Sequence, residues 1–98
     1  MALESEFQKD LRDELEDLFP GCKVLKMDPL LHGQGIPDLL ILYKKHWAAL
    51  EVKRSEREPY RPNQEWYLDM MNEMSFAATI YPENRKEILR ALQRSFRS

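Results

Sequence analysis

The sequence predicts a mixed α/β (α+β) domain with the element order α-β-β-β-α-β-α, and three observations carry this prediction. Residues 3–19 contain no Gly or Pro and repeat apolar side chains at helical spacing. Two short apolar runs, 39–42 and 47–50, flank a basic tetrapeptide, which indicates a β-hairpin. A second helical pattern over 64–74 precedes a β-prone segment, 76–81. This alternation favours a sheet covered by helices.

Length and composition describe one domain spanning residues 1–98. A chain of 98 residues can bury a single hydrophobic core. No apolar run reaches the ~18 residues of a membrane span, and the acidic N-terminus lacks a signal-peptide pattern. The single cysteine, Cys22, cannot form an internal disulfide, which favours a reducing, cytoplasmic compartment. We therefore expect no membrane partner.

The net charge of −2 conceals an asymmetry along the chain. Residues 1–19 carry seven acidic and two basic groups, a local charge of −5. Residues 20–98 carry ten acidic and thirteen basic groups, a local charge of +3. Nucleic-acid-binding domains are often strongly basic, so the overall charge alone does not indicate DNA binding.

The first helix is predicted over Leu3–Phe19 and ends before Pro20-Gly21. Its apolar stripe consists of Leu3, Phe7, Leu11, Leu15 and Leu18. Glu4 falls inside this stripe, whereas Glu6 falls on the solvent side. A carboxylate aimed at the core is costly unless it is paired or metal-bound, so Glu4 is the anomalous acid. A solvated side chain at a fraying terminus is the alternative interpretation of Glu4.

A first strand is predicted over Cys22–Met27, followed by a loop over Asp28–Ile36 that contains one Pro and two Gly residues. The Gly33-Gln34-Gly35 sequence in this loop is not a phosphate-loop motif, because no helix follows it. We interpret it as the turn that leads into the hairpin.

The hairpin places three ionisable groups together at its open end. If Lys44-Lys45 forms a two-residue turn, the numbers of paired residues sum to 89, and Asp38 lies opposite Glu51. Lys53, two residues beyond Glu51, shares their face. A register slip of two residues would keep this arrangement, and a slip of one would not. Two adjacent carboxylates favour a bound cation, and Mg²⁺ is typically held by one or two carboxylates with water and substrate phosphate.

A charged loop with two prolines follows the hairpin and contains Arg54, Arg57 and Arg61. These arginines are candidates for phosphate contacts, and solvated linker charges are the alternative. Asn63 is predicted to cap a helix over Gln64–Met74.

The apolar stripe of that helix consists of Trp66, Tyr67, Met70, Met71 and Met74. We expect the stripe to pack in the core or to form, in part, a dimer surface, since methionine packs adaptably. The last predicted elements are a strand over Phe76–Tyr81 and a helix over Glu83–Phe96. The residues of this helix expected to face inward are Ile88, Leu89, Leu92 and Phe96.

Pro37-Asp38, followed by Glu51-Val52-Lys53 on the next strand, resembles the signature of the PD-(D/E)XK nuclease superfamily. More narrowly, QGIPDLLILY and WAALEVK, followed by Asn63-Gln64, resemble the stand-alone virus-type replication-repair nuclease (VRR-NUC) domains of phages and bacteria. The resemblance covers nearly the whole chain. It implies a restriction-endonuclease-like αβββαβ core with a central mixed sheet flanked by helices, to which this chain adds a C-terminal helix.

The resemblance also implies roles for individual residues. Asp38, Glu51 and the Val52 carbonyl would bind Mg²⁺ or Mn²⁺, and Glu4 on the first helix would complete the site or hold a second ion. Lys53 would orient the attacking water or stabilise charge in the transition state.

Gln64 stands where related nucleases often place a glutamine that points at the site, and an exposed first-turn residue is the alternative. The implied activity is that of a Mg²⁺-dependent endodeoxyribonuclease in DNA repair. It would cut branched DNA, above all Holliday junctions, as a homodimer in the cytoplasm of a bacterium or phage-infected cell. Three alternatives stay open: a monomeric flap or nicking nuclease, a non-catalytic nucleic-acid-binding module, and a surface ion-pair cluster.

Overall fold

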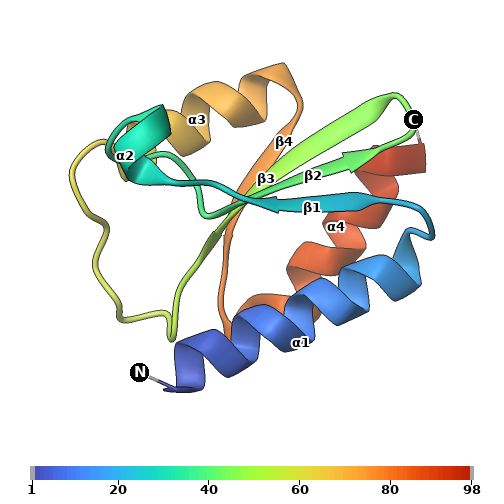
Figure 1. The fold of residues 1–98 in the computed structure, drawn as a ribbon, viewed down its shortest axis with the longest axis horizontal. Coiled ribbons are helices and arrows are strands. Elements are labelled where there is room, and N and C mark those ends of the chain that lie inside the picture. Colours follow the sequence, from blue (N-terminus) through green and yellow to red (C-terminus); the bar gives the residue numbers. More distant parts are fainter. Residues whose placement is uncertain (1, 98) are drawn as a thin grey trace.

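The centre of the fold is a four-stranded mixed sheet (Figure 1). The computed structural model describes the backbone of residues 2–97 and the side chains of residues 6–28 and 30–97. Within that range the strands lie side by side in the order β1 (Lys23–Lys26), β2 (Leu39–Tyr43), β3 (His46–Val52) and β4 (Phe76–Ile80). The first three are antiparallel, and β4 is parallel to β3 because α3 (Gln64–Met74) crosses over between them. The predicted mixed α/β fold is confirmed.

The β2–β3 hairpin has the predicted register. Tyr43 pairs with His46 and Leu39 pairs with Leu50, so the paired residue numbers sum to 89. Lys44 adopts φ +55°, in the left-handed region that primed two-residue turns require. Lysine adopts this conformation less readily than Asn or Gly, so pairing along the strands, more than the turn sequence, sets the register.

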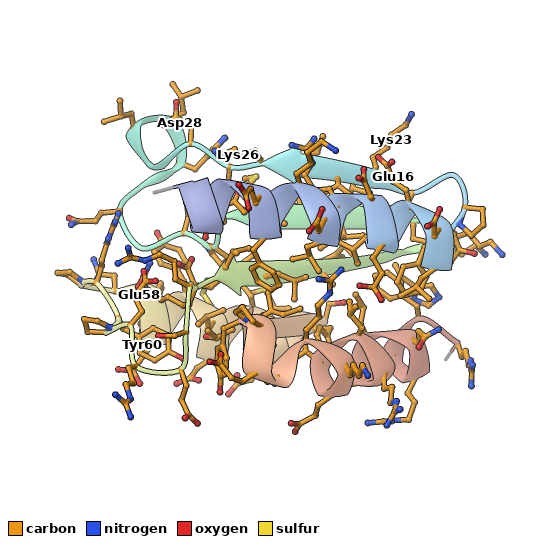
Figure 2. All side chains as sticks on the ribbon, turned by 90° about the horizontal axis from the view of Figure 1, so that it is seen from below. Glu16, Lys23, Lys26, Asp28, Glu58 and Tyr60 are labelled. Atoms are coloured by element: carbon orange, nitrogen blue, oxygen red, sulfur yellow. The ribbon has the colours of Figure 1, made fainter. Side chains whose placement is uncertain are left out.

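Helices cover both faces of the sheet. α1 (Ala2–Leu18) and α4 (Arg85–Arg97) pack on one face and lie in front of the strands in Figure 2, whereas α3 packs on the other face. The main core, between the sheet and the α1–α4 layer, consists of Phe7, Leu11, Leu15, Phe19, Cys22, Val24, Leu39, Ile41, Ala48, Leu50, Val52, Ile80, Leu89, Leu92 and Phe96. Among the helices of residues 2–97, none has the length and apolar character needed to cross a membrane.

The segment predicted as a loop, Asp28–Ile36, contains a short helix, α2 (Pro29–His32). Asp28 Oδ1 accepts a hydrogen bond from the N–H of Leu30 (2.9 Å), and the Asp28 carbonyl accepts one from the N–H of Leu31 (3.0 Å). One aspartate therefore organises this turn through local side-chain and backbone hydrogen bonds. The Pro and Gly content of the segment by itself predicts only a loop, so it does not reveal the hydrogen bonds of Asp28 that organise the turn.

The predicted closing helix is divided into a 3₁₀ turn, η1 (Pro82–Asn84), and α4. The Asn84 side chain accepts a hydrogen bond from the Tyr81 N–H (2.8 Å) and donates one to the Thr79 carbonyl (3.1 Å), which tightens the turn after β4. Leu89, Leu92 and Phe96 are buried as predicted, and Ile88 packs against the core.

The prediction that the α3 stripe packs in the core is wrong at two positions, because Trp66 and Met74 are 61% and 68% exposed, while the alternative of a partial dimer surface stays a prediction. Gln64 and Leu68 are the buried residues of this helix. Asn63 occupies the predicted cap position, but with φ +70° and without a side-chain cap hydrogen bond. The helix is rotated so that Gln64 is buried and its side-chain amide forms hydrogen bonds to charged groups. A hydropathy pattern does not predict such hydrogen bonds.

Candidate functional site

The open end of the β2–β3 hairpin borders a cavity of about 390 Å³. Its polar lining consists of Gln34, Asp38, Glu51, Glu58, Arg61 and Gln64, and its remaining lining consists of Leu30, Gly35, Ile36 and Val52. The loop between β3 and α3 contributes one wall, and its residues Glu58 and Tyr60 lie at the same end of the molecule in Figure 2. Residues predicted from the hairpin and from α3 therefore meet in one cavity.

Glu51 is a buried carboxylate on β3, 4% exposed. Its Oε2 accepts a hydrogen bond from Gln64 Nε2 (2.9 Å) and lies 3.6 Å from Lys53 Nζ. Its Oε1 is buried and has no hydrogen-bond partner among the described residues. A buried carboxylate oxygen without a partner is costly, so Oε1 is the atom at which a bound cation would be most stabilising.

The electrostatics of Glu51 agree with this geometry. Burial and the neighbouring Asp38 carboxylate raise the pKa of Glu51 to about 8, although the charge of Lys53 acts in the opposite direction. Two carboxylates in a desolvated site repel each other, and either protonation or a bound cation relieves the repulsion. The Asp38–Glu51 pair therefore has the electrostatic character of a cation site.

Lys53 directly follows β3, and it is only 2% exposed. Its Nζ donates hydrogen bonds to Gln64 Oε1 (2.9 Å) and to the Pro59 carbonyl (3.1 Å). The carboxylates of Glu51 and Glu58 lie 3.6 and 3.8 Å from Nζ. Groups from β3, the following loop and α3 thus hold the ammonium group in one position beside the cavity.

Gln64 connects the two charged side chains of the hairpin. Its Oε1 accepts hydrogen bonds from Lys53 Nζ (2.9 Å) and from the Arg61 N–H (2.6 Å), while its Nε2 donates to Glu51 Oε2 (2.9 Å). The alternative of an exposed first-turn residue is wrong, because Gln64 is 6% exposed. All of its side-chain polar atoms are used to position Glu51, Lys53 and the loop before α3.

Asp38 lies immediately before β2 and lines the cavity. Its Oδ2 accepts a hydrogen bond from the Val52 N–H (2.9 Å), and its carbonyl accepts one from the Met27 N–H (2.7 Å). These bonds fix the carboxylate next to the end of β3. The Val52 side chain packs in the main core, so Val52 offers the site only its backbone.

Glu4 lies in α1, but its side chain is outside the part of the chain that the structure describes. The start of α1 lies near the loop that follows β3 (Figure 1). Both segments line a separate cavity of about 260 Å³, whose lining consists of Glu6, Phe7, Asp10, Arg54 and Pro82. Glu6 and Phe7, which follow the first turn of α1, therefore lie near Arg54, the residue after Lys53.

The three arginines predicted to contact phosphate have different positions. Arg61 lines the site cavity. Arg54 Nε lies 3.5 Å from Glu58 Oε1, and Arg57 is exposed in the loop. Only Arg61 of the three thus reaches the wall of the cavity.

Glu58 is a charged residue of the site that the sequence did not indicate. Its Oε1 accepts a hydrogen bond from the Arg54 N–H (2.8 Å), and its Oε2 lies 3.8 Å from Lys53 Nζ. Partial burial acts to raise the pKa of Glu58, but the hydrogen bond from Arg54 and the charge of Lys53 outweigh it, so the pKa is lowered. The one signal in the sequence is that Glu58 lies four residues after Arg54. This spacing brings the two residues together only where the backbone turns.

The donor set consists of carboxylate oxygens, which suit hard divalent ions such as Mg²⁺ and Mn²⁺. The described residues contain no cluster of three or more His, Cys, Asp or Glu side chains able to hold a metal, so they do not form a closed zinc-type site. Mg²⁺ needs fewer protein ligands, typically one or two carboxylates, with water and substrate phosphate around it. Asp38 and Glu51, with its unpartnered Oε1, meet that requirement.

Comparisons with known proteins assign no family. No protein-family model, curated protein or solved structure matches the chain. A function is therefore inferred from the geometry of the site and from the pattern Pro37-Asp38 with Glu51-Val52-Lys53.

Proposed function

We propose that the chain is a Mg²⁺- or Mn²⁺-dependent DNA endonuclease that hydrolyses phosphodiester bonds in branched DNA. The observation that carries the proposal is the unpartnered Oε1 of Glu51, buried beside Asp38 and close to a fixed Lys53. The resemblance of these residues to the PD-(D/E)XK signature supports the same chemistry.

Burial of these carboxylates has a cost that protonation or a bound cation relieves. An ionised group removed from water is destabilising unless it is paired and hydrogen-bonded. Lys53 and Gln64 compensate Oε2 of Glu51 but leave Oε1 without a partner. Strongly perturbed carboxylates in a cavity wall are typical of functional sites. A surface ion-pair cluster does not fit, because Glu51 and Lys53 are 4% and 2% exposed.

Each residue of the site would contribute a separate part of the hydrolysis. Asp38, Glu51 and the Val52 carbonyl would hold the divalent ion, and Glu4 would complete the site or hold a second ion. When bound, the ion would polarise the scissile phosphate and lower the pKa of the attacking water. Lys53 would place a positive charge beside the phosphate as negative charge develops on its oxygens.

Gln64 would act by positioning, since its hydrogen bonds keep Glu51 and Lys53 in their relative places. Symmetric cutting of a four-way junction requires two sites, and a two-fold dimer of a small domain provides them. Holliday junctions cut by a homodimer in the cytoplasm of a bacterium or phage-infected cell are therefore part of the proposal.

The test compares cleavage of a four-way junction, a linear duplex, a single strand and a 5′-flap in Mg²⁺, Mn²⁺ or EDTA. Glu51→Gln and Lys53→Met are the site variants, and Glu73→Gln makes the same charge change at an exposed position of α3 as the matched control. We expect metal-dependent paired nicks in the junction. Both site variants should cleave at least about 100-fold more slowly while binding DNA within a few-fold of wild type.

Other outcomes would replace parts of the proposal. Cleavage of the flap alone would support metal-dependent hydrolysis but indicate a flap nuclease. Sedimentation would then test whether that nuclease is a monomer. Binding of DNA without cleavage, unchanged by EDTA, would instead indicate a non-catalytic nucleic-acid-binding module.

A further inference from the structure

The short helix α2 carries two leucines that point into solvent. Leu30 and Leu31 are 93% and 78% exposed, the highest values among the exposed large hydrophobic residues of the described chain. Burying a leucine side chain is worth roughly 1.5–3 kcal/mol, and adjacent exposed apolar residues commonly mark an interaction site. These two adjacent leucines are therefore a candidate contact surface.

The turn that presents the leucines is anchored on both sides. Asp28 holds the N–H groups of Leu30 and Leu31 through its side chain and carbonyl (2.9 and 3.0 Å). On the other side, Gly35 adopts φ +95°, and a Cβ there would lie 2.7 Å from the Cβ of Asn63. The segment after α2 is thus packed against the start of α3, and local hydrogen bonds to Asp28 order the turn itself.

This anchored turn borders the candidate site. Leu30 lines the same cavity as Asp38 and Glu51. The segment after α2 meets the start of α3, since a Cβ on Gly33 would lie 3.3 Å from Tyr67 Oη, and Figure 2 places Asp28 at the same end of the molecule as Glu58. Whatever lies in the cavity against the two carboxylates is therefore within reach of Leu30.

We propose that Leu30 and Leu31 form an apolar wedge that packs against an unstacked nucleobase next to the scissile phosphate. This inference rests on the proposed nuclease function and specifies its substrate. Intact duplex DNA presents phosphates and groove edges, and the apolar faces of its bases are covered by stacking. Aliphatic side chains reach those faces only where a step is opened, as wedge-inserting proteins do. DNA with interrupted stacking at a branch, nick or mismatch is therefore the substrate class that the wedge selects.

A second copy of the chain is a weaker candidate for this position. Stable protein interfaces bury about 1,200–2,000 Å² in total, and two leucines on a single turn provide a small part of that area. A nucleobase, in contrast, presents a flat apolar face comparable in size to the two side chains. Leu30 is 93% exposed and still borders the cavity, which also favours the molecule that would occupy that cavity.

The experiment uses a four-way junction and a linear duplex that carry 2-aminopurine, at the branch point and at the matched internal position, in EDTA so that no cleavage occurs. Wild type is compared with Leu30→Ser/Leu31→Ser, with the apolar Leu30→Met/Leu31→Met, and with Met74→Ser, which removes an exposed apolar side chain from the other end of α3. We expect wild type to increase 2-aminopurine fluorescence in the junction. The serine double variant should lose this increase and bind the junction about 10-fold more weakly, with duplex binding unchanged. The methionine and Met74→Ser variants should behave as wild type.

The two proposals fail in distinguishable ways. If metal-dependent cleavage is present but the serine variant keeps the fluorescence increase and the junction preference, the wedge is wrong and the nuclease stands. If wild type cleaves no DNA in Mg²⁺ or Mn²⁺, the nuclease and the role of the wedge beside it are both overturned. A change in sedimentation mass confined to the serine variant would assign the leucines to an interface between copies and overturn the wedge.

Discussion

Burial of side chains has opposite consequences on the two faces of β3. Leu50 and Glu51 are adjacent, and they are 0% and 4% exposed. Leu50 packs in the main core against the layer formed by α1 and α4, where the loss of contact with water is stabilising. Glu51 points to the other face, where burial leaves a carboxylate oxygen without a partner. Equal burial thus stabilises the fold on one face and, on the other, creates a site that a cation would complete.

Truncation of the core face should have the largest effect. Leu50→Ala is expected to lower the free energy of unfolding by about 2–5 kcal/mol, because it removes apolar contacts and leaves a cavity that the sheet cannot close. Urea denaturation measures the change. Leu25→Ala, at a position 44% exposed on β1, is the control and should cost less than about 1 kcal/mol. Equal losses in the two variants would contradict the assignment of the core to this face.

The hydrogen-bond hub of the site face should come next in effect. Gln64→Leu is expected to cost about 1–3 kcal/mol, because the buried Lys53 and Glu51 and the partly buried Arg61 N–H each lose a partner. Gln93→Leu on α4, away from the site, makes the same chemical change as a control and should be nearly neutral. A neutral Gln64→Leu would show that water replaces the amide without cost.

Removing the charge of Glu51 should stabilise the protein, with a dependence on pH. The folded state raises the pKa of Glu51 from 4.5 to about 8, so it binds this proton more tightly than the unfolded chain does. The stability contributed by this proton is fully present below about pH 4.5 and is lost as the pH rises to about 8. In EDTA, Glu51→Gln should therefore gain on the order of 1 kcal/mol near pH 8 and less at pH 5. Parallel pH profiles of wild type and variant in urea denaturation would assign the titration to another group.

The stabilisation by bound Mg²⁺ should be the smallest of these effects, and it should offset the cost of burying the ionised Glu51. The ion binds the ionised carboxylate, so its affinity should increase as the pH approaches the pKa of Glu51, which is about 8. We expect millimolar Mg²⁺ to raise Tm by about 2–5 °C at pH 8.5 and by less at pH 6. Glu51→Gln should abolish the shift, and Glu73→Gln should leave it unchanged. A shift of equal size at both pH values would argue against an ion on Glu51.

The hairpin shows how far local reasoning reaches. The alternation of side chains along a strand predicts that Asp38 and Glu51 share a face, and the observed pairing of Leu39 with Leu50 agrees with that register. The stripe of α3 shows where such reasoning fails. Hydropathy placed Trp66 in the core, but the helix turns Gln64 inward, because a buried amide with three hydrogen bonds is more stabilising there than hydropathy predicts.

The sequence by itself determined the order of the longer helices and strands, though not the short α2 and η1, together with the register of the hairpin and the grouping of Asp38, Glu51 and Lys53, because these follow from short-range periodicity. Only the tertiary structure decided which groups complete the site. Glu58 and Leu30 reach the cavity from a loop and from the short helix α2. Their positions depend on local hydrogen bonds and on the packing of Gly35 against Asn63, which is distant along the chain. Such contacts leave no periodic trace in a sequence, so the walls of the cavity emerge only when the chain is folded.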